Sequence, residues 1–251
     1  MSLRSRRSPM DRQTFLVLCA ETDLDALWAW RGLRQLGLGR VELVTAGMLA
    51  SSIHWSHTVG QGDAGVKIVL ADGRAIRSEE IAGALNRLTH IPLHAGGASD
   101  IERSYAEQEW SAFSVSWLYS LTKIMLNRPV PQGLCGARRH HADWTWLAVQ
   151  AGLRVFPCQL AAGGTATAIP LARSRVWVVG ESIVGNLAMA DETMDACRRL
   201  AASAGCTLLG LEFVLGTDGI PRFASATATP LLHPGGGALL AALATALRAA
   251  P

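Results

Sequence analysis

The stretch from residue 99 to residue 136 constrains the fold more than any other part of the chain. Its apolar residues recur at spacings of three and four, which is the pattern of an amphipathic helix. They form one stripe, with Ala106 and Leu118 beside it: Tyr105, Trp110, Phe113, Trp117 and Leu121. Ser99 lies three residues before Glu102, a spacing typical of a capping box at a helix start. We therefore predict a long helix from Ser99 that is central to the fold.

A short apolar run and a loop follow this helix. The run Ile124–Leu126 predicts a buried strand, and it ends at Asn127-Arg128-Pro129. Proline cannot continue a helix or an interior strand, so the chain must turn there. Residues 131–136 then form a segment that contains glycine, proline and cysteine. The predicted order is helix, strand and a loop with the composition of a functional site.

These residues carry a family resemblance. The pattern Y-A-x-Q-E-x-x-A-F-x-x-x-W-L over residues 105–118, followed by a strand that ends at N-R-P, resembles a junction in RimK-like ATP-grasp ligases that modify peptides. In that family the junction connects the first and second domains. The resemblance implies a nucleotide held between two small sheets, with lysines on the phosphates, and with carboxylates and an asparagine on magnesium.

Composition narrows the class of protein. The chain has 251 residues, enough for one large domain or two small ones, and 49% of them are hydrophobic while 17% are charged. This apolar balance favours a large partner interface. No apolar run reaches the roughly 18 residues of a membrane span, so we expect no membrane partner. A net charge of +3 is too small to indicate nucleic-acid binding.

The cysteines and the N-terminal residues indicate where in the cell the protein is expected. Five cysteines are odd in number and unevenly spaced, which indicates reduced thiols and a cytoplasmic protein. The first residues are rich in arginine but no apolar signal core follows them. We predict that residues 1–13 form a disordered basic tail.

Residues 14–127 predict an open, parallel α/β domain, the first domain that the resemblance implies. Strand, helix and strand patterns succeed one another, which favours a right-handed crossover and parallel pairing. A hairpin pattern with an Asp-Gly turn follows, and a second helix is expected from Ser78 to about Arg87. The other expected elements are strands at Thr14–Ala20 and Val41–Thr45, a helix at Leu24–Leu36, and hairpin strands at Val66–Leu70 and Arg74–Arg77.

Residues 128–251 predict a reduced ATP-grasp-like domain, so that the whole chain is α/β with an α+β second part. Its segments alternate between helix and strand patterns, and turns of the Val-Val-Gly and Asp-Gly kind separate paired strands. The expected helices are Asp143–Ala151, Thr193–Ala204 and Ala238–Ala249, and the expected strands are Arg175–Gly180, Glu181–Gly185, Thr207–Val214 and Arg222–Ala226.

The nucleotide site that the resemblance implies is poorly represented in the sequence. Only 15 residues lie between Gln159 and Arg175, too few for a four-stranded lid subdomain at about 5 to 6 residues per strand. The only lysines, Lys67 and Lys123, precede the second domain. Arg173 and Arg175 are the candidates to replace lysine on phosphates, although arginine differs in reach and geometry. We predict that most of the lid is missing.

The implied magnesium site is also incomplete. The family presents Glu-x-Asn on its last strand, whereas this strand reads Phe-Ala-Ser-Ala-Thr over residues 223–227. Glu212 lies on the neighbouring strand, and no carboxylate follows Asp218. One carboxylate makes a poor magnesium site. We therefore expect no metal site and no cofactor, with ATP and magnesium as the alternative.

Cys135 offers a different chemistry. His140 and His141 follow it closely, so a catalytic thiolate at Cys135 with His141 as its base is one hypothesis. An ordinary turn cysteine beside a solvated basic patch explains the same residues. A zinc or copper site made of the cysteine and the two histidines is a further alternative, without the usual Cys-x-x-Cys pair.

The function that we infer is a non-catalytic binding or complex-forming subunit with a degenerate ATP-grasp-like fold. The resemblance implies a role in peptide or small-metabolite biosynthesis. The expected partner is a protein or peptide, in a homo-oligomer or in a complex with a catalytic subunit. An ATP-dependent carboxylate–amine ligase with an atypical or shared active site is the main alternative. The candidate ligand-binding residues are Arg128, Gln132, Arg138, His140, Arg175 and Glu212.

Overall fold

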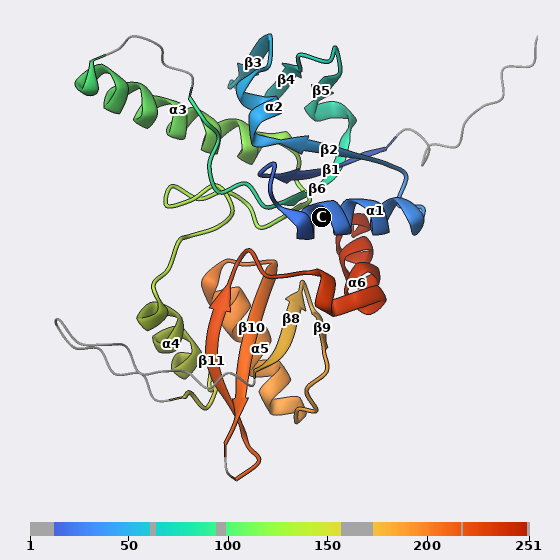
Figure 1. Cartoon of the computed structure of the whole chain (residues 1–251), viewed down its shortest axis with the longest axis vertical. Helices are drawn as coiled ribbons and strands as arrows, with labels where there is room; N and C mark the ends of the chain where they lie inside the picture. Colours follow the sequence, from blue (N-terminus) through green and yellow to red (C-terminus); the bar gives the residue numbers. More distant parts are fainter. Residues whose placement is uncertain (1–12, 61–63, 94–98, 157–172, 217, 250–251) are drawn as a thin grey trace, which may run out of the picture. The chain divides into compact units, whose positions relative to one another are not determined.

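The computed structural model describes residues 13–60, 64–93, 99–156, 173–216 and 218–249. The chain divides into two compact units (Figure 1). Unit 1 comprises residues 1–135 and 247–251, and unit 2 comprises residues 136–246. The predicted basic tail, apart from residue 13, and the predicted loss of the lid between residues 159 and 172 lie outside the described residues.

Unit 1 contains the predicted parallel sheet. Its four strands have the order β2-β1-β6-β7, and all neighbours are parallel. The strands are β1 (Thr14–Cys19), β2 (Arg40–Thr45), β6 (Ile81–Asn86) and β7 (Met125–Leu126). Helices α1 (Leu24–Gln35) and α2 (Ala46–Ala50) flank β2 in the chain. Every residue of β1 is buried, as expected for the interior of a covered parallel sheet.

A second, antiparallel sheet belongs to the same unit. It has the order β3-β4-β5, with strands β3 (His54–Thr58), β4 (Gly65–Val69) and β5 (Ala75–Arg77). The predicted hairpin at the Asp-Gly turn is thus confirmed. The side chains of Val66, Ile68 and Ile76 are buried in one core with residues of the parallel sheet. The small sheet is therefore part of unit 1 and not a separate module.

The helix predicted from Ser78 is wrong. Only a single 3-10 turn forms, η2 (Ser78–Glu80), and the chain continues as strand β6 beside β1. Gly83 lets β6 pack closely, because an added Cβ would lie 3.0 Å from the Leu247 carbonyl oxygen and 3.3 Å from the Phe15 ring. Interior parallel strands are buried on both faces, so their sequences lack the alternation that marks a half-exposed strand.

The long helix α3 (Asp100–Leu121) begins at the predicted capping box. The Ser99 backbone N–H donates to Glu102 Oε2 at 2.9 Å, and the Glu102 N–H donates to Ser99 Oγ at 3.4 Å. Trp117 is buried near the C-terminal end, whereas Tyr105 is 66% exposed, so the predicted stripe is wrong at that position. The reason is length, because the first turns of α3 extend past the sheets of unit 1 (Figure 1).

An aromatic cluster fixes the second half of α3. The ring of Trp55 on β3 lies 5.6 Å from the rings of Trp110 and Phe113 and 5.0 Å from that of Trp117, between centroids. All three contacts are edge-on, the geometry that aromatic quadrupoles favour. The tryptophans of this region therefore serve core packing.

Unit 2 contains an antiparallel sheet with helices packed on it. The strand order is β11-β10-β8-β9. Its strands are β8 (Ser174–Val179), β9 (Ser182–Gly185), β10 (Leu208–Leu215) and β11 (Pro221–Thr227), and its helices are α4 (His141–Gln150), α5 (Asp191–Ala204) and most of α6 (Gly236–Arg248), which the 3-10 turn η3 (His233–Gly235) precedes. Side chains of α4, α5 and the sheet share one core. The strand pairs and helices predicted for this part of the chain are confirmed.

Candidate functional site

The most complete polar site of unit 2 surrounds Glu212 on β10. β10 lies between β8 and β11, and its register places Arg175 and Ser225 directly opposite Glu212. Arg173 Nη1 donates to Glu212 Oε2 at 2.5 Å, and Arg175 Nε donates to Oε1 at 3.4 Å. Ser225 Oγ donates to Oε2 at 2.8 Å. Both carboxylate oxygens thus have partners from neighbouring strands.

The environment of Glu212 stabilises its charged form. Its side chain is 23% exposed. Burial by itself would raise the pKa of this carboxyl group, but hydrogen bonds from Arg173 and Ser225 and the charge of Arg173 outweigh it. The pKa of Glu212 is therefore lowered. At neutral pH the site contains one carboxylate between two guanidinium groups.

A cavity of about 280 Å³ borders these arginines. Trp177 lines it, and this ring is fixed because its Nε1 donates to the Leu231 carbonyl oxygen at 2.8 Å. The remaining lining residues come from β9 and its following turn, from η3 and from the start of α6: Val184, Gly185, Asn186, Pro234, Gly235 and Ala238. The cavity combines two arginines with an otherwise uncharged wall, which suits a small anionic group.

The donor set around Glu212 does not fit a divalent cation. In the described part of the chain no three His, Cys, Asp or Glu residues lie close enough to hold a metal ion. Magnesium is usually bound through one or two carboxylates together with substrate phosphates. Here the two arginines occupy the carboxylate oxygens and would repel a cation. The groups around Glu212 therefore suit an anion and not magnesium.

The predicted nucleophile Cys135 lies in the interior of unit 1. Its side chain is 5% exposed, and its Sγ donates to the Asn86 carbonyl oxygen at 2.9 Å. Asn86 is fully buried and donates through Nδ2 to the carbonyl oxygens of Asn127 and Leu134. These bonds fasten the loop after β7 to the end of β6. A catalytic role for Cys135 stays a prediction.

Arg128, predicted to bind a ligand, contacts the end of α3. Its guanidinium donates to the carbonyl oxygens of Tyr119 at 2.6 Å and Lys123 at 2.8 Å. It also lies 4.3 Å from the centroid of the Tyr119 ring. Cations favour helix C-termini because carbonyl groups there lack intrahelical donors. Arg128 also lines an open cavity of about 890 Å³, so ligand binding stays a prediction.

The other predicted site residues lie near the junction of the two units in the sequence. Gln132 is exposed in unit 1, whereas Arg138 and His140 are exposed in unit 2. His141 is the first residue of α4. The His140 N–H donates to Asp143 Oδ2 at 3.0 Å, a bond that stabilises the start of the helix. Catalysis by His141 and ligand binding by the other three stay predictions.

The structure brings Arg175 and Glu212 together and adds Ser225, which the sequence did not suggest. Regular pairing counted from the turn between β10 and β11 would place Ala224 opposite Glu212, and a register shift between Glu212 and Phe213 brings Ser225 there instead, so locating the turn would not have revealed this partner. A second carboxylate with two arginine partners, Glu42 in unit 1, was also missed. One of its partners, Arg74, lies 32 residues away in the sequence. No local sequence pattern predicts a contact between residues so far apart in the chain.

Comparisons with known proteins identify the fold. No family model and no curated protein matches the sequence. Among solved structures, the macrocyclase MdnC from Microcystis aeruginosa MRC, bound with precursor peptide MdnA, has a TM-score of 0.70 and 13% identity, over 94% of this chain and 99% of that one. An ATP-grasp ligase of Chryseobacterium gregarium, in complex with ADP and with a leader and core peptide, has a TM-score of 0.67 and 9% identity, over 94% and 96%. The ATP-grasp ligase PsnB, complexed with minimal precursor, Mg and ADP, has a TM-score of 0.61 and 17% identity, over 94% and 98%. The chain therefore has the fold of the peptide-modifying ATP-grasp ligases.

Proposed function

We propose that this chain is a non-catalytic subunit with an ATP-grasp fold that binds a peptide or protein partner in peptide or small-metabolite biosynthesis. The observation that carries the proposal is the set of bonds made by the Glu212 carboxylate. Both of its oxygens are bound by Arg173, Arg175 and Ser225. Phosphoryl transfer relies on magnesium that bridges carboxylates and phosphates, and this arrangement leaves the carboxylate without that capacity.

The arginine cavity beside Glu212 supports anion binding. Two guanidinium groups face one carboxylate, so the cluster retains one positive charge. A carboxylate of a partner would neutralise that charge through charge-assisted hydrogen bonds. The solved structures of similar fold support a peptide as the partner, since several of them contain a precursor peptide.

The buried thiols support a reducing compartment, and we infer a cytoplasmic location. The described cysteines, Cys19, Cys135, Cys197 and Cys206, are buried. Burial raises the pKa of Cys19 and of Cys197 to about 12, so these thiols stay protonated at neutral pH. None of the helices in the described ranges has the length and apolar character that crossing a membrane requires.

Calorimetric titration with ATP and magnesium tests the non-catalytic assignment. We expect no saturable heat up to millimolar nucleotide, because magnesium lacks a carboxylate partner at Glu212. Micromolar binding that needs magnesium and disappears in Glu212→Ala would contradict the proposal. Arg222→Ala is the matched control, since Arg222 pairs with Asp218 in the turn between β10 and β11 and does not contact Glu212.

The partner is tested by light scattering and capture. We expect the chain to be an oligomer, or to retain a second polypeptide in a pull-down under native conditions. A monomer that retains no partner would contradict a complex-forming role. This result is independent of the nucleotide titration, so the non-catalytic role and the partner-binding role can be contradicted separately.

A ligase with an atypical or shared active site is the second candidate. Arg173 and Arg175 favour it, because two guanidinium groups at a cavity can hold phosphate oxygens as well as carboxylates. In that case nucleotide binding would appear only when a second chain that supplies the missing cation ligands is added. Titration of the purified chain alone and with its captured partner distinguishes the two candidates.

A further inference from the structure

Unit 1 contains a second basic cavity, remote in sequence from the Glu212 site. Its volume is about 580 Å³. Side chains from α1, β2, α2 and the turn before β5 line it, together with Gly39: Trp30, Arg34, Arg40, Val41, Glu42, Leu43, Met48 and Arg74. Three of these residues are arginines and one is a glutamate, so the lining carries an excess of positive charge. Such a cavity attracts anions.

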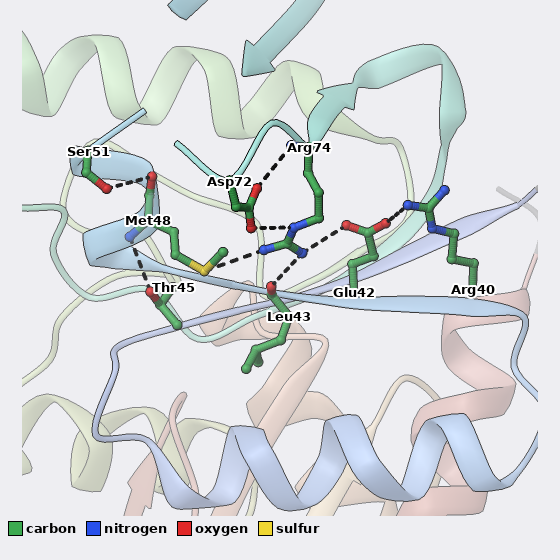
Figure 2. Close-up of polar contacts among 8 residues, drawn as sticks. All are labelled: Arg40, Glu42, Leu43, Thr45, Met48, Ser51, Asp72 and Arg74. Carbon is green, nitrogen blue, oxygen red and sulfur yellow. Dashed lines mark hydrogen bonds and ion pairs between the residues drawn. The ribbon is translucent and has the colours of Figure 1, made fainter. Parts of the chain in front are cut away.

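Arg74 is the structural member of this group. Its Nη1 donates to Glu42 Oε2 at 3.1 Å and to the Leu43 carbonyl oxygen at 3.4 Å, and its Nε donates to Asp72 Oδ2 at 2.7 Å. Figure 2 shows Glu42 between Arg74 and Arg40, with both arginines directed at its carboxylate. The donors of Arg74 are therefore committed to holding the hairpin turn against β2.

Arg34 has a different environment. Its guanidinium lies 4.8 Å from the centroid of the Trp30 ring, one helical turn earlier on α1. Trp30 is itself oriented by a bond from its Nε1 to the Val41 carbonyl oxygen at 3.0 Å. Within the described residues, no carboxylate or carbonyl group accepts a hydrogen bond from Arg34. A stacked guanidinium keeps its planar fork of donors available for a carboxylate or a phosphate.

The edge of β2 already has two of its carbonyl groups in use. β2 is the last strand on its side of the sheet in the described chain, and such an edge can pair with an incoming strand. However, the carbonyl oxygens of Val41 and Leu43 accept bonds from Trp30 and Arg74. These bonds compete with strand addition and favour recognition of a partner through its side chains.

We propose that this cavity is a second binding site, in which Arg34 and Arg40 hold the carboxylate side chains of an acidic peptide segment. Arg34 supplies a bidentate fork, and Arg40 supplies the donors that Glu42 does not occupy. Trp30 and Met48 provide apolar surface for the methylene groups of the bound side chain. Arg74 and Glu42 form the rigid wall of the site and do not bind the peptide.

The test uses a synthetic glutamate–glycine hexapeptide and its glutamine–glycine counterpart, titrated into the full chain. We expect the glutamate peptide to bind, the glutamine peptide to bind at least about tenfold more weakly, and affinity to fall as salt rises. Arg34→Ala should weaken binding by about tenfold or more. Arg31→Ala is the matched control, because Arg31 is exposed on the same helix and does not line the cavity.

Several outcomes would overturn the proposal. They are no binding of the glutamate peptide at millimolar concentration, equal binding of the two peptides, or equal loss in the Arg34 and Arg31 variants. Saturable binding of inorganic phosphate that is lost in Arg34→Ala, together with no peptide binding, would assign the cavity to phosphate. Should Arg34→Ala lower the unfolding midpoint, Arg34→Lys keeps the charge and removes the fork, and must still weaken binding. Loss of peptide binding in Arg173→Ala but not in Arg34→Ala would assign the peptide to the Glu212 cavity, which overturns this proposal and leaves the proposed function standing.

Discussion

Glu42 in unit 1 and Glu212 in unit 2 are both strand carboxylates with two arginine partners, but their partners come from different places. Arg175 and Ser225 reach Glu212 from the two strands beside β10, and Arg173 reaches it from the residue before β8. Glu42 is bound by Arg40 of its own edge strand and by Arg74 of a distant turn. The first cluster is a product of sheet register, and the second is a tertiary contact.

This difference determines what each cluster can do. The Glu212 partners lie on adjacent strands of one sheet or directly before one of them, so the cluster is built into the sheet and its arginines line the cavity. The Glu42 cluster joins two sheets of unit 1, because Arg74 lies directly before β5. Removal of Glu212 should therefore leave unpaired arginines in unit 2. Removal of Glu42 should only weaken the contact between the two sheets of unit 1.

The largest expected effect is that of removing Glu212. Glu212→Ala leaves Arg173, Arg175 and Ser225 without their common acceptor, and we expect the free energy of unfolding to fall by about 2 kcal/mol. Glu42→Ala should cost about half as much, about 1 kcal/mol, because Arg74 still has Asp72 as a partner. Urea unfolding measures both. Equal losses would break the distinction between the clusters.

Removal of Arg74 should have a smaller effect than removal of Glu212. Arg74→Ala loses the bonds to Glu42 and to the Leu43 carbonyl, and we expect a loss of about 1 kcal/mol, reduced because the side chain is 33% exposed. Arg77→Ala is the control, since its pair with Glu80 is solvent-exposed and should contribute less than about 0.5 kcal/mol. A smaller loss of unfolding free energy for Arg74→Ala than for Arg77→Ala would show that Arg74 does not hold the turn against β2.

The smallest expected effect is on pH dependence. The folded-state pKa of Glu212 lies below its ordinary value of 4.5. The stabilisation by the charged form is therefore complete above that value and is lost as pH falls through the folded-state pKa. In unfolding measured from pH 7 to about pH 3, wild type should lose more stability than Glu212→Gln. Identical pH profiles would show that Arg173 and Ser225 do not stabilise the charge.

Much of the local structure could be predicted because its signals are local. The Ser99 and Glu102 pair marks the start of α3, and the Asp-Gly pairs mark the hairpin turns. The resemblance over residues 105–118 indicated the ATP-grasp fold, which the structural comparisons confirm. Arg175 and Glu212 were also identified from the sequence as candidate ligand-binding residues, but the pairing of their strands, which places them opposite each other, came from the structure.

The failures have one cause. β6 was predicted as a helix since Ser78 and the two following glutamates resemble a helix start, while its true partner, β1, lies more than 60 residues earlier. Tyr105 fits the apolar period of α3, but the described residues leave its side chain exposed. Burial depends on what the rest of the chain brings to a position, and periodicity alone cannot supply that information.

The sequence by itself determined most of the order of helices and strands, and their caps and turns. These features depend on hydrogen bonds and side-chain spacings within a few residues, which the sequence states directly. Only the tertiary structure decided that Arg74 meets Glu42, that Cys135 is buried against Asn86, and that Arg34 borders a cavity. Those contacts join segments that are far apart in the chain, and core packing selects them.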